Sequence, residues 1–416
     1  MAQASNDSTL NELFSSLLSP EGWQLLATVD PSMVATKDAA WALNEKLRKD
    51  GHDPAIVRAV VMQSELRFRA RVKFGPFADS LVFTPAGLEQ ATRLTIAGMH
   101  ARRFTGAGCT HVADLGCGIG TDSIALASAE LQVTAVERDE TTAAAATLNL
   151  MPFPNATVVH ASAQETDLTD IDGIWLDPAR RTEAAGNTKR IFDPEAFSPP
   201  LSFVEQLVDQ GKDVGVKLGP GLPHEAIPDT AEAVWISDHG SVVEACLWFG
   251  RLARPGIRRA ALVIDKNGAH ELTSPVVAAE GEKAPVGALS NFLYEPDGAV
   301  IRSHLIAELL LQTGGTLLDE HIAYFTHEDL VVTPFAKAYK VLAVHDYNVK
   351  KLKSWVKANG IGQLDIKKRG VDVTPEELRR ILLAGSPKSA KNHATLVLSR
   401  IGDKRLAIEV EPVRNP

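Results

Sequence analysis

Three glycines at alternate positions give the strongest constraint on the fold of this chain. They lie in "HVADLGCGIGTDSIALA", residues 111 to 127, between an apolar run and an alanine-rich run. Glycine permits a sharp turn and a close approach of backbone N–H groups to a ligand. A helix that begins directly after such a loop adds positive potential. The segment therefore predicts a strand, a ligand-binding loop and a helix, which form the first step of a parallel α/β sheet.

The region that follows keeps this alternation as far as about residue 250. We expect strands near 111–116, 132–137, 156–161, 173–178 and 213–219, with helices near 121–129 and 140–150. Alternating strands and helices are typical of a parallel sheet with helices on both faces. Residues 231–250 have the pattern of an antiparallel hairpin that closes the sheet. The fold class is therefore α/β with a Rossmann-like core.

The two ends of the chain have different patterns. Residues 8 to 74 indicate a helical N-terminal region, and Thr84 followed by Pro85 is typical of a helix start. The C-terminal part alternates strands and helices, with Asn348 as one helix cap and a capping box at 374–377. We divide the chain into a helical region (1–82), the core (83–252), a connecting region of uncertain fold (253–335) and a C-terminal α/β module (336–416).

Charge is distributed unevenly along the chain. Its 416 residues have a formal net charge of −9, but residues 336–416 hold 17 Lys and Arg against 8 Asp and Glu. The C-terminal module is therefore basic and the remainder acidic. No membrane span and no secretion signal are expected, which predicts a cytoplasmic protein. The three cysteines lack paired spacing, so we expect free thiols and no metal site.

The glycine spacing and two acids indicate which ligand the loop binds. Gly116, Gly118 and Gly120 form GxGxG, whereas dinucleotide-binding loops have GxGxxG. The carboxylate of Asp114 would repel a pyrophosphate but could pair with an ammonium group. Glu137, at the end of the second strand, could accept both hydroxyl groups of a ribose. S-adenosylmethionine fits these features better than NAD does, and better than a turn without a ligand.

A second candidate site follows the fourth strand, in "WLDPARR", residues 175–181. Asp177 could accept a hydrogen bond or a proton from an attacking amine, Pro178 would stiffen the turn, and Arg180 could hold a phosphate or carboxylate. The alternative is that Asp177 and Pro178 only end the strand and that the arginines after them are solvated. No cysteine has an electropositive setting, so attack by a nitrogen is favoured over a cysteine adduct. His224 could assist but is as easily a bystander.

These motifs resemble class I S-adenosylmethionine-dependent methyltransferases over residues 83–250. "DLGCGIG" is similar to that family's cofactor loop, "VTAVERD" to its ribose-binding acid, and "LDPAR" to the catalytic motif of amine methyltransferases. The resemblance departs at Ala179 and Arg180, where a proline and an aromatic are usual, and at Ser162, where an acid is usual. It implies the following cofactor-binding residues: Thr84, Asp114, Gly116, Cys117, Gly118, Gly120, Glu137, Arg138, Ser162, Ala163 and Asp177.

The whole arrangement resembles a bacterial methyltransferase subfamily with a C-terminal THUMP-like domain. The segments that carry this resemblance are "LVFTPAGLEQAT", "YEPDGAVIR" and "LDIKKRGVDVTPEELRR". THUMP domains are associated with RNA, which implies an RNA substrate, tRNA or rRNA. Lys367, Lys368 and Arg369 leave a strand together and are the candidate RNA contacts. A second basic segment, residues 67–74, could guide a substrate or be a plain surface helix.

The sequence thus predicts an S-adenosylmethionine-dependent methyltransferase that acts on a base nitrogen of RNA. Methylation of a protein or small molecule is an alternative, in which the basic module serves only in packing. A catalytically inactive RNA-binding protein that retains the cofactor pocket is a third possibility. Ala179 and Arg180, which replace the usual proline and aromatic residue, would permit an inactive protein of this kind.

Overall fold

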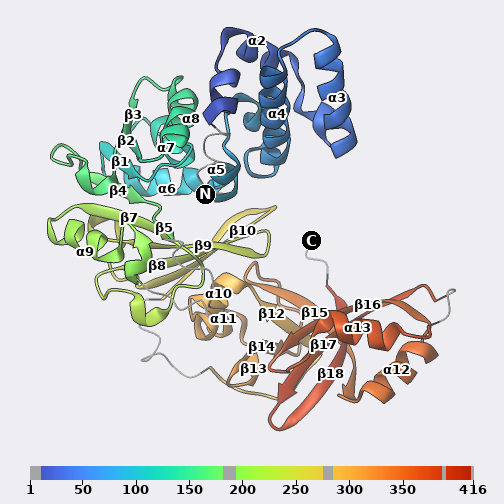
Figure 1. The fold of residues 1–416 in the computed structure, drawn as a ribbon. Coiled ribbons are helices and arrows are strands. Elements are labelled where there is room, and N and C mark those ends of the chain that lie inside the picture. The colour runs from blue at the N-terminus through green and yellow to red at the C-terminus, as the bar shows by residue number, and fades with distance from the viewer. Residues whose placement is uncertain (1–10, 181–193, 275–283, 387–389, 414–416) are drawn as a thin grey trace. The chain divides into compact units, whose positions relative to one another are not determined.

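The computed structural model describes residues 11–180, 194–274, 284–386 and 390–413 (Figure 1). The chain divides into two compact units. The first unit comprises Met1–Lys217 and Trp248–Ala253, and the second comprises Leu218–Leu247 and Arg254–Pro416. None of the helices in the described ranges is both long enough and apolar enough to cross a membrane.

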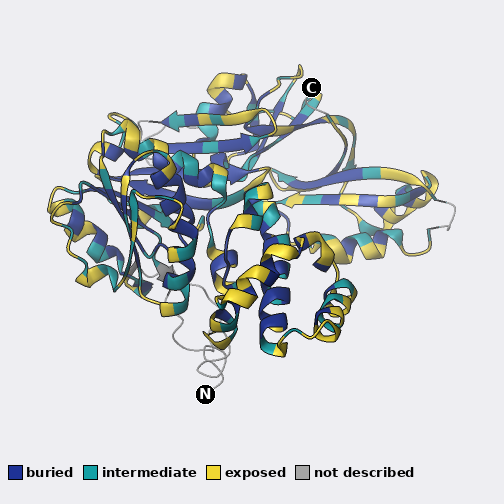
Figure 2. Cartoon of the chain, turned by 90° about the horizontal axis from the view of Figure 1, so that it is seen from above, coloured by how far each residue is buried: buried dark blue, intermediate teal, exposed yellow. Residues whose placement is uncertain are grey.

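The first unit begins with helices, as the sequence predicts. Residues 11–17 are helical, and α2 (Pro20–Thr28), α3 (Lys37–Lys49) and α4 (Pro54–Phe74) follow. Ser19, Thr36 and Asp53 cap these helices through side-chain oxygens that accept from backbone N–H groups. Much of α4 is buried, as Figure 2 shows by its dark blue turns, so this helix is the core of the region.

The basic residues of α4 bind other parts of the first unit. Arg67 donates from Nε to the Leu81 carbonyl at 2.9 Å, and Arg71 forms an ion pair of 2.7 Å with Asp79. Lys73 donates from Nζ to three carbonyl oxygens, those of residues 88, 89 and 91, at 2.8 to 2.9 Å. These groups fix α4 against residues 79–91. They therefore do not form the free substrate guide that the sequence suggested as one possibility.

A parallel sheet forms the centre of the first unit, and its strand order is β7-β4-β1-β2-β3. Every neighbouring pair in this order is parallel. The strands are β1 (His111–Leu115), β2 (Gln132–Glu137), β3 (Ala156–His160), β4 (Gly173–Leu176) and β7 (Asp213–Leu218). The helices are α5 (Pro85–Gln90), α6 (Leu94–Gly106), α7 (Thr121–Ser128), α8 (Glu140–Leu150) and α9 (Leu201–Asp209). The predicted Rossmann-like fold is confirmed, and the strand ends meet at one edge.

The second unit contains two sets of strands. One set has the order β11-β10-β8-β9, with β8 (Glu232–Asp238), β9 (Ser241–Trp248), β10 (Arg259–Asp265) and β11 (Gly268–Ser274). His239 and Gly240 join β8 to β9, and both have positive φ. A two-residue turn of this kind is typical of an antiparallel hairpin, as predicted.

The other set is a seven-stranded sheet with the order β13-β14-β12-β15-β18-β17-β16. Its strands are β12 (Phe292–Pro296), β13 (Thr316–Asp319), β14 (Ile322–His327), β15 (Ala336–Asp346), β16 (Ile361–Arg369), β17 (Asn392–Ile401) and β18 (Lys404–Pro412). Its helices are α10 (Gly298–Arg302), α11 (Ile306–Thr313), α12 (Val349–Ala358) and α13 (Pro375–Leu383). Strands β12 to β14 belong to the connecting region, residues 253–335, whose fold could not be predicted from the sequence.

The predicted helix caps of the C-terminal module can be compared with the structure directly. Asn348 caps α12 by accepting from the Lys351 N–H at 3.1 Å, as predicted. Thr374 stands at the N-cap of α13, but its side chain makes no capping hydrogen bond. The predicted capping box was therefore wrong in its bonding, although the helix starts where it was expected.

A buried amide joins the helical region to the glycine loop. Asn149 accepts from the Val82 N–H at 2.7 Å and donates to the carbonyls of Val82 and Ile119 at 2.9 Å. All three partners are backbone groups, so this one side chain fixes the segment before α5 against the loop between β1 and α7. Its position therefore sets the geometry of both segments.

We expect Asn149→Ala to lower the free energy of unfolding by about 2 to 5 kcal/mol, because it leaves buried backbone groups without partners. Denaturant unfolding measures this loss. The matched change at the exposed helix residue Gln206, Gln206→Ala, should alter stability by only about 0.5 kcal/mol. Equal effects of the two substitutions would show that the Asn149 bonds contribute nothing beyond ordinary helix propensity.

Candidate active site

A cavity of about 850 Å³ opens in the first unit at the carboxyl ends of the parallel strands. It is lined by the glycine loop, the ends of β2, β4 and β7, the start of α5 and residues 161–164. Its volume is within the usual range for sites that hold small molecules and cofactors. The structure brings these predicted site residues to its wall: Thr84, Asp114, Gly116, Cys117, Gly118, Glu137, Arg138, Ser162, Ala163, Asp177 and Pro178.

The glycine loop has the backbone conformation that its spacing predicts. Gly116, Gly118 and Gly120 have φ values of 86°, 57° and 86°, in the region that other residues adopt only with strain. Gly116 and Gly118 line the cavity, whereas Gly120 is absent from its described wall. Gly120 is the N-cap of α7, and a Cβ there would lie 3.3 Å from Leu150. The positive φ and the closeness of Leu150 both favour glycine at this position.

Glu137 is held in place by backbone N–H groups. Its Oε2 accepts from Gly118 N at 3.0 Å, and its Oε1 accepts from Asp139 N at 2.9 Å. Each carboxylate oxygen retains a further lone pair. The carboxylate is therefore fixed beside the glycine loop and can still accept hydrogen bonds from two ligand hydroxyls.

Two buried carboxylates below the glycine loop have opposite pKa shifts. Burial, and next the charge of Asp122, raises the pKa of Asp114 to about 8 against one hydrogen bond from Ser123. Burial would also raise the pKa of Asp122, but a hydrogen bond from His100 and the His100 and Lys217 charges lower it below its usual value. Asp114 is thus the carboxylate that lacks a cationic partner, and it faces the cavity.

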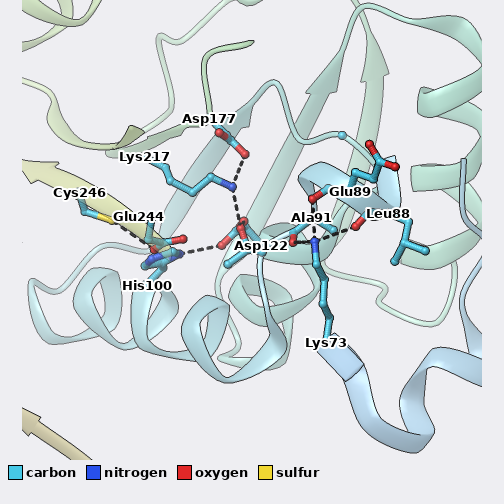
Figure 3. Close-up of polar contacts among 12 residues, drawn as sticks. Lys73, Leu88, Glu89, Ala91, His100, Asp122, Asp177, Lys217, Glu244 and Cys246 are labelled. Carbon is cyan, nitrogen blue, oxygen red and sulfur yellow. Dashed lines mark hydrogen bonds and ion pairs between the residues drawn. The ribbon is translucent and has the colours of Figure 1, made fainter. Parts of the chain in front are cut away.

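A chain of polar contacts connects Asp122 to the end of β4 (Figure 3). Asp122 accepts from Thr92 Oγ1 at 2.6 Å and contacts His100 Nδ1 at 2.8 Å. Lys217 donates to Thr92 Oγ1 at 3.0 Å and forms an ion pair with Asp177 Oδ2. The sequence analysis identified Asp177 but not its partners. A lysine inside the apolar run "DVGVKLG" was the available signal, because a lone charge in a buried strand requires a partner.

The other predicted core residues have simpler surroundings. The pKa of the Cys117 thiol is raised well above its usual value by burial and by nearby Asp114 and Glu137, which agrees with the absence of a nucleophilic cysteine. Arg138 donates to Ser198 Oγ at 3.1 Å. The side chain of Arg180 lies outside the described part of the chain. His224 donates from Nε2 to the Arg302 carbonyl at 2.7 Å, within the second unit, and is not among the cavity residues.

The three predicted RNA contacts in β16 do not share one surface. Lys367 forms an ion pair of 2.7 Å with Glu295, and Arg369 lies over the ring of Tyr324 with its guanidinium carbon 5.5 Å from the ring centre. Lys368 is exposed and follows Leu364 and Ile366 on the opposite face of the strand, where these two pack with α12 and α13. Sequence neighbours in a strand alternate between faces, so adjacency did not make a common binding surface.

The charges of the cavity suit a cationic cofactor. Its described wall carries six carboxylates, those of Asp114, Asp122, Glu137, Asp139, Glu140 and Asp177, against the two cations Arg138 and Lys217. Such a wall disfavours the pyrophosphate of a dinucleotide and favours S-adenosylmethionine, which carries both an ammonium and a sulfonium. Glu137 would hold the ribose, and Asp114 would accept from the ammonium.

We expect cofactor affinity to depend on the Asp114 proton. Because Asp114 must be ionised to pair with an ammonium, the association constant should rise about tenfold per pH unit below pH 8 and level off above it. Calorimetry with S-adenosylhomocysteine at several pH values measures this slope. Asp114→Asn should abolish the slope and lose about 1.5 to 3 kcal/mol of binding at high pH. A slope that persists in Asp114→Asn would assign the proton to another group.

Comparison with known proteins places this geometry in a family. The family described as "THUMP domain-like" matches residues 336–412, and "Domain of unknown function (DUF8688)" matches residues 11–70. A protein of Porphyromonas gingivalis W83 assigned as a methyltransferase has a crystal structure that is similar in fold, with a TM-score of 0.70, 19% identity and coverage of 98% of both chains.

Sequence similarity is higher to an uncharacterized S-adenosylmethionine-dependent methyltransferase of Mycobacterium tuberculosis, found in two strains. The identity is 31% over 354 residues, which cover 81% of this chain and 91% of the relative. Both the cofactor predicted from the glycine loop and the predicted enzyme class agree with this relative. The chain belongs to the S-adenosylmethionine-dependent methyltransferases and carries a THUMP domain-like region at its C-terminal end.

Proposed function

We propose that this methyltransferase acts on a nitrogen atom of RNA, and that its C-terminal module holds the RNA. The observation that carries the proposal is a face of unpaired lysines on α12, within the residues matched by the THUMP domain-like family. Methylation of a protein or small molecule is the alternative against which it is tested.

Lysines without acidic neighbours cover the outer side of α12. Lys350, Lys353 and Lys357 recur at helical spacing, and all three are exposed. No carboxylate of the described chain forms an ion pair with any of them, and α12 itself contains no acid. The helix packs through Leu352 and Val356. This arrangement leaves three positive charges available to phosphates.

The end of β4 supports a nitrogen acceptor. Asp177 lines the cavity with a third of its side chain exposed (32%), so a ligand can reach its carboxylate. A carboxylate there can accept a hydrogen bond from an N–H group and orient the nitrogen lone pair. Burial raises the pKa of Cys109 to about 11 and holds that of Cys117 well above its usual value, which disfavours a thiolate adduct. Bound S-adenosylmethionine supplies the methyl group on a positively charged sulfur.

The acceptor class is tested by incubating the protein with labelled S-adenosylmethionine and RNA from a strain that lacks its gene. Label in RNA that maps to a base nitrogen supports the proposal. Label that enters only protein or small molecules of the same extract overturns it and selects the alternative. Binding of cofactor with no label in any fraction favours a catalytically inactive protein.

Asp177→Asn should leave the affinity for S-adenosylhomocysteine within about twofold and reduce turnover by about 10²-fold, since the acceptor loses its carboxylate partner. Single-turnover kinetics and calorimetry separate the two effects. Glu165→Gln removes an exposed carboxylate that does not line the cavity and should leave both values unchanged. Unchanged turnover in Asp177→Asn would exclude Asp177 from the reaction.

Replacing Lys350, Lys353 and Lys357 together by Gln should weaken RNA binding and flatten its salt dependence, by roughly 0.7 in the log–log slope per lost single-strand phosphate contact. Filter binding with bulk tRNA at several salt concentrations measures this slope. Lys37, Lys46 and Lys49 of α3 are also exposed, so their replacement is the charge-matched control. Equal slopes for the two triple variants would contradict an RNA site on α12.

A further inference from the structure

The ion pair between Lys217 and Asp177 is part of the architecture of the sheet. Strands β4 and β7 pair in parallel register up to Leu176 and Val216, so the next residue on each strand is Asp177 and Lys217. Both side chains leave their strands at the same edge, where both line the cavity. The Lys217 side chain is only 12% exposed. A buried ammonium at this point requires compensation, and Asp177 supplies it.

The charge of Lys217 also acts on the two buried carboxylates Asp114 and Asp122. This lysine contacts Asp177 directly and Thr92 at 3.0 Å, and its charge lowers the pKa values of both Asp114 and Asp122. Arg138, the other cation of the described wall, instead donates to Ser198 on its own side of the cavity. Removing the Lys217 charge would therefore leave a more negative cavity and break the ion pair between Lys217 and Asp177.

We propose that Lys217 is a positioning residue for methyl transfer: its ammonium fixes the Asp177 carboxylate and limits the negative charge that the cavity presents to the sulfonium. The first part rests on the proposed role of Asp177, whereas the second part requires only the cofactor. Nothing in the sequence motifs assigns a role to this lysine. It would act through Asp177 and through the field of the cavity, without itself bonding to the transferred group.

The balance of charge explains why such a cation would be useful. In methyl transfer the acceptor nitrogen forms a bond to the methyl carbon, the carbon–sulfur bond breaks with its electron pair on sulfur, and nitrogen releases a proton. The positive charge on sulfur disappears as this happens. A cavity with excess negative charge would stabilise the reactant more than the transition state. Lys217 offsets that excess.

The test compares Lys217→Met with the parent in calorimetric binding of S-adenosylmethionine and S-adenosylhomocysteine. These two ligands differ in the charge on sulfur. Loss of the Lys217 ammonium should therefore raise the preference for S-adenosylmethionine by at least about fivefold. Lys217→Arg, which keeps the charge, should restore the parental ratio. If Lys217→Met weakens the binding of both ligands equally and lowers the melting temperature, Lys217 has only a structural role and the proposal is overturned.

A matched control is available at the other end of the same strand. Lys212 donates to the carbonyls of Leu168 and Ile171 at 2.7 Å and does not line the cavity. Lys212→Met should therefore change stability but not the ratio of the two affinities. If Lys217→Met does not fold, Lys217→Gln retains a polar group for Thr92 and gives the same comparison.

The binding ratio needs no acceptor, so it separates this proposal from that of RNA methylation. A changed ratio together with no methylation of RNA would reject only the RNA substrate. Where an acceptor is identified, Lys217→Met should lower kcat at least tenfold without raising the KM of the cofactor. The double variant with Asp177→Asn should be little slower than Asp177→Asn alone. If the losses of kcat in the two single variants add up in the double variant, Lys217 does not act through Asp177.

Discussion

Burial of several carboxylates at one edge of a parallel sheet is the constraint on which the active site depends. Asp114 and Asp122 are both buried, and each accepts a hydrogen bond from a hydroxyl group, that of Ser123 or of Thr92; Asp122 in addition contacts His100. Their pKa values therefore move apart, and Asp114 is left as the group that gains most from a cationic ligand. The proposed cofactor site would in this sense be an incomplete ion pair, which a cationic ligand would complete.

The walls of the site are held by contacts from the helical N-terminal region. Lys73 binds three carbonyl oxygens at the end of α5, and Asn149 joins the segment before α5 to the glycine loop. Burial, and next the charges of Lys217 and Arg93, lower the pKa of Lys73 to about 8. Arg67, which lies within the residues matched by DUF8688, donates to the Leu81 carbonyl, so that region also contributes to the position of the segment before α5.

Site residues that are close together along the chain could be predicted from the sequence, whereas contacts between distant segments could not. Asp114, Gly116, Gly118 and Glu137 lie within one strand, helix and strand, so local spacing could place them beside one cavity. The partner of Asp177 could not be found in this way, because it depends on β4 and β7 being neighbours across a long intervening segment. The ion pair of Lys367 could not be foreseen for the same reason, since Glu295, its partner, belongs to a distant strand. Charge counting finds basic segments but not which of their cations are already paired.

The partition of charge between the core and the C-terminal module has a consequence for a nucleic-acid acceptor. The cavity wall is acidic, which favours the cationic cofactor but repels phosphates. An RNA acceptor, as proposed, would therefore gain its electrostatic affinity away from the cavity, on a surface with unpaired cations such as α12. The same repulsion would favour entry of a neutral base over entry of the backbone. The acidity needed for the cofactor would in this way also restrict which part of the substrate reaches Asp177.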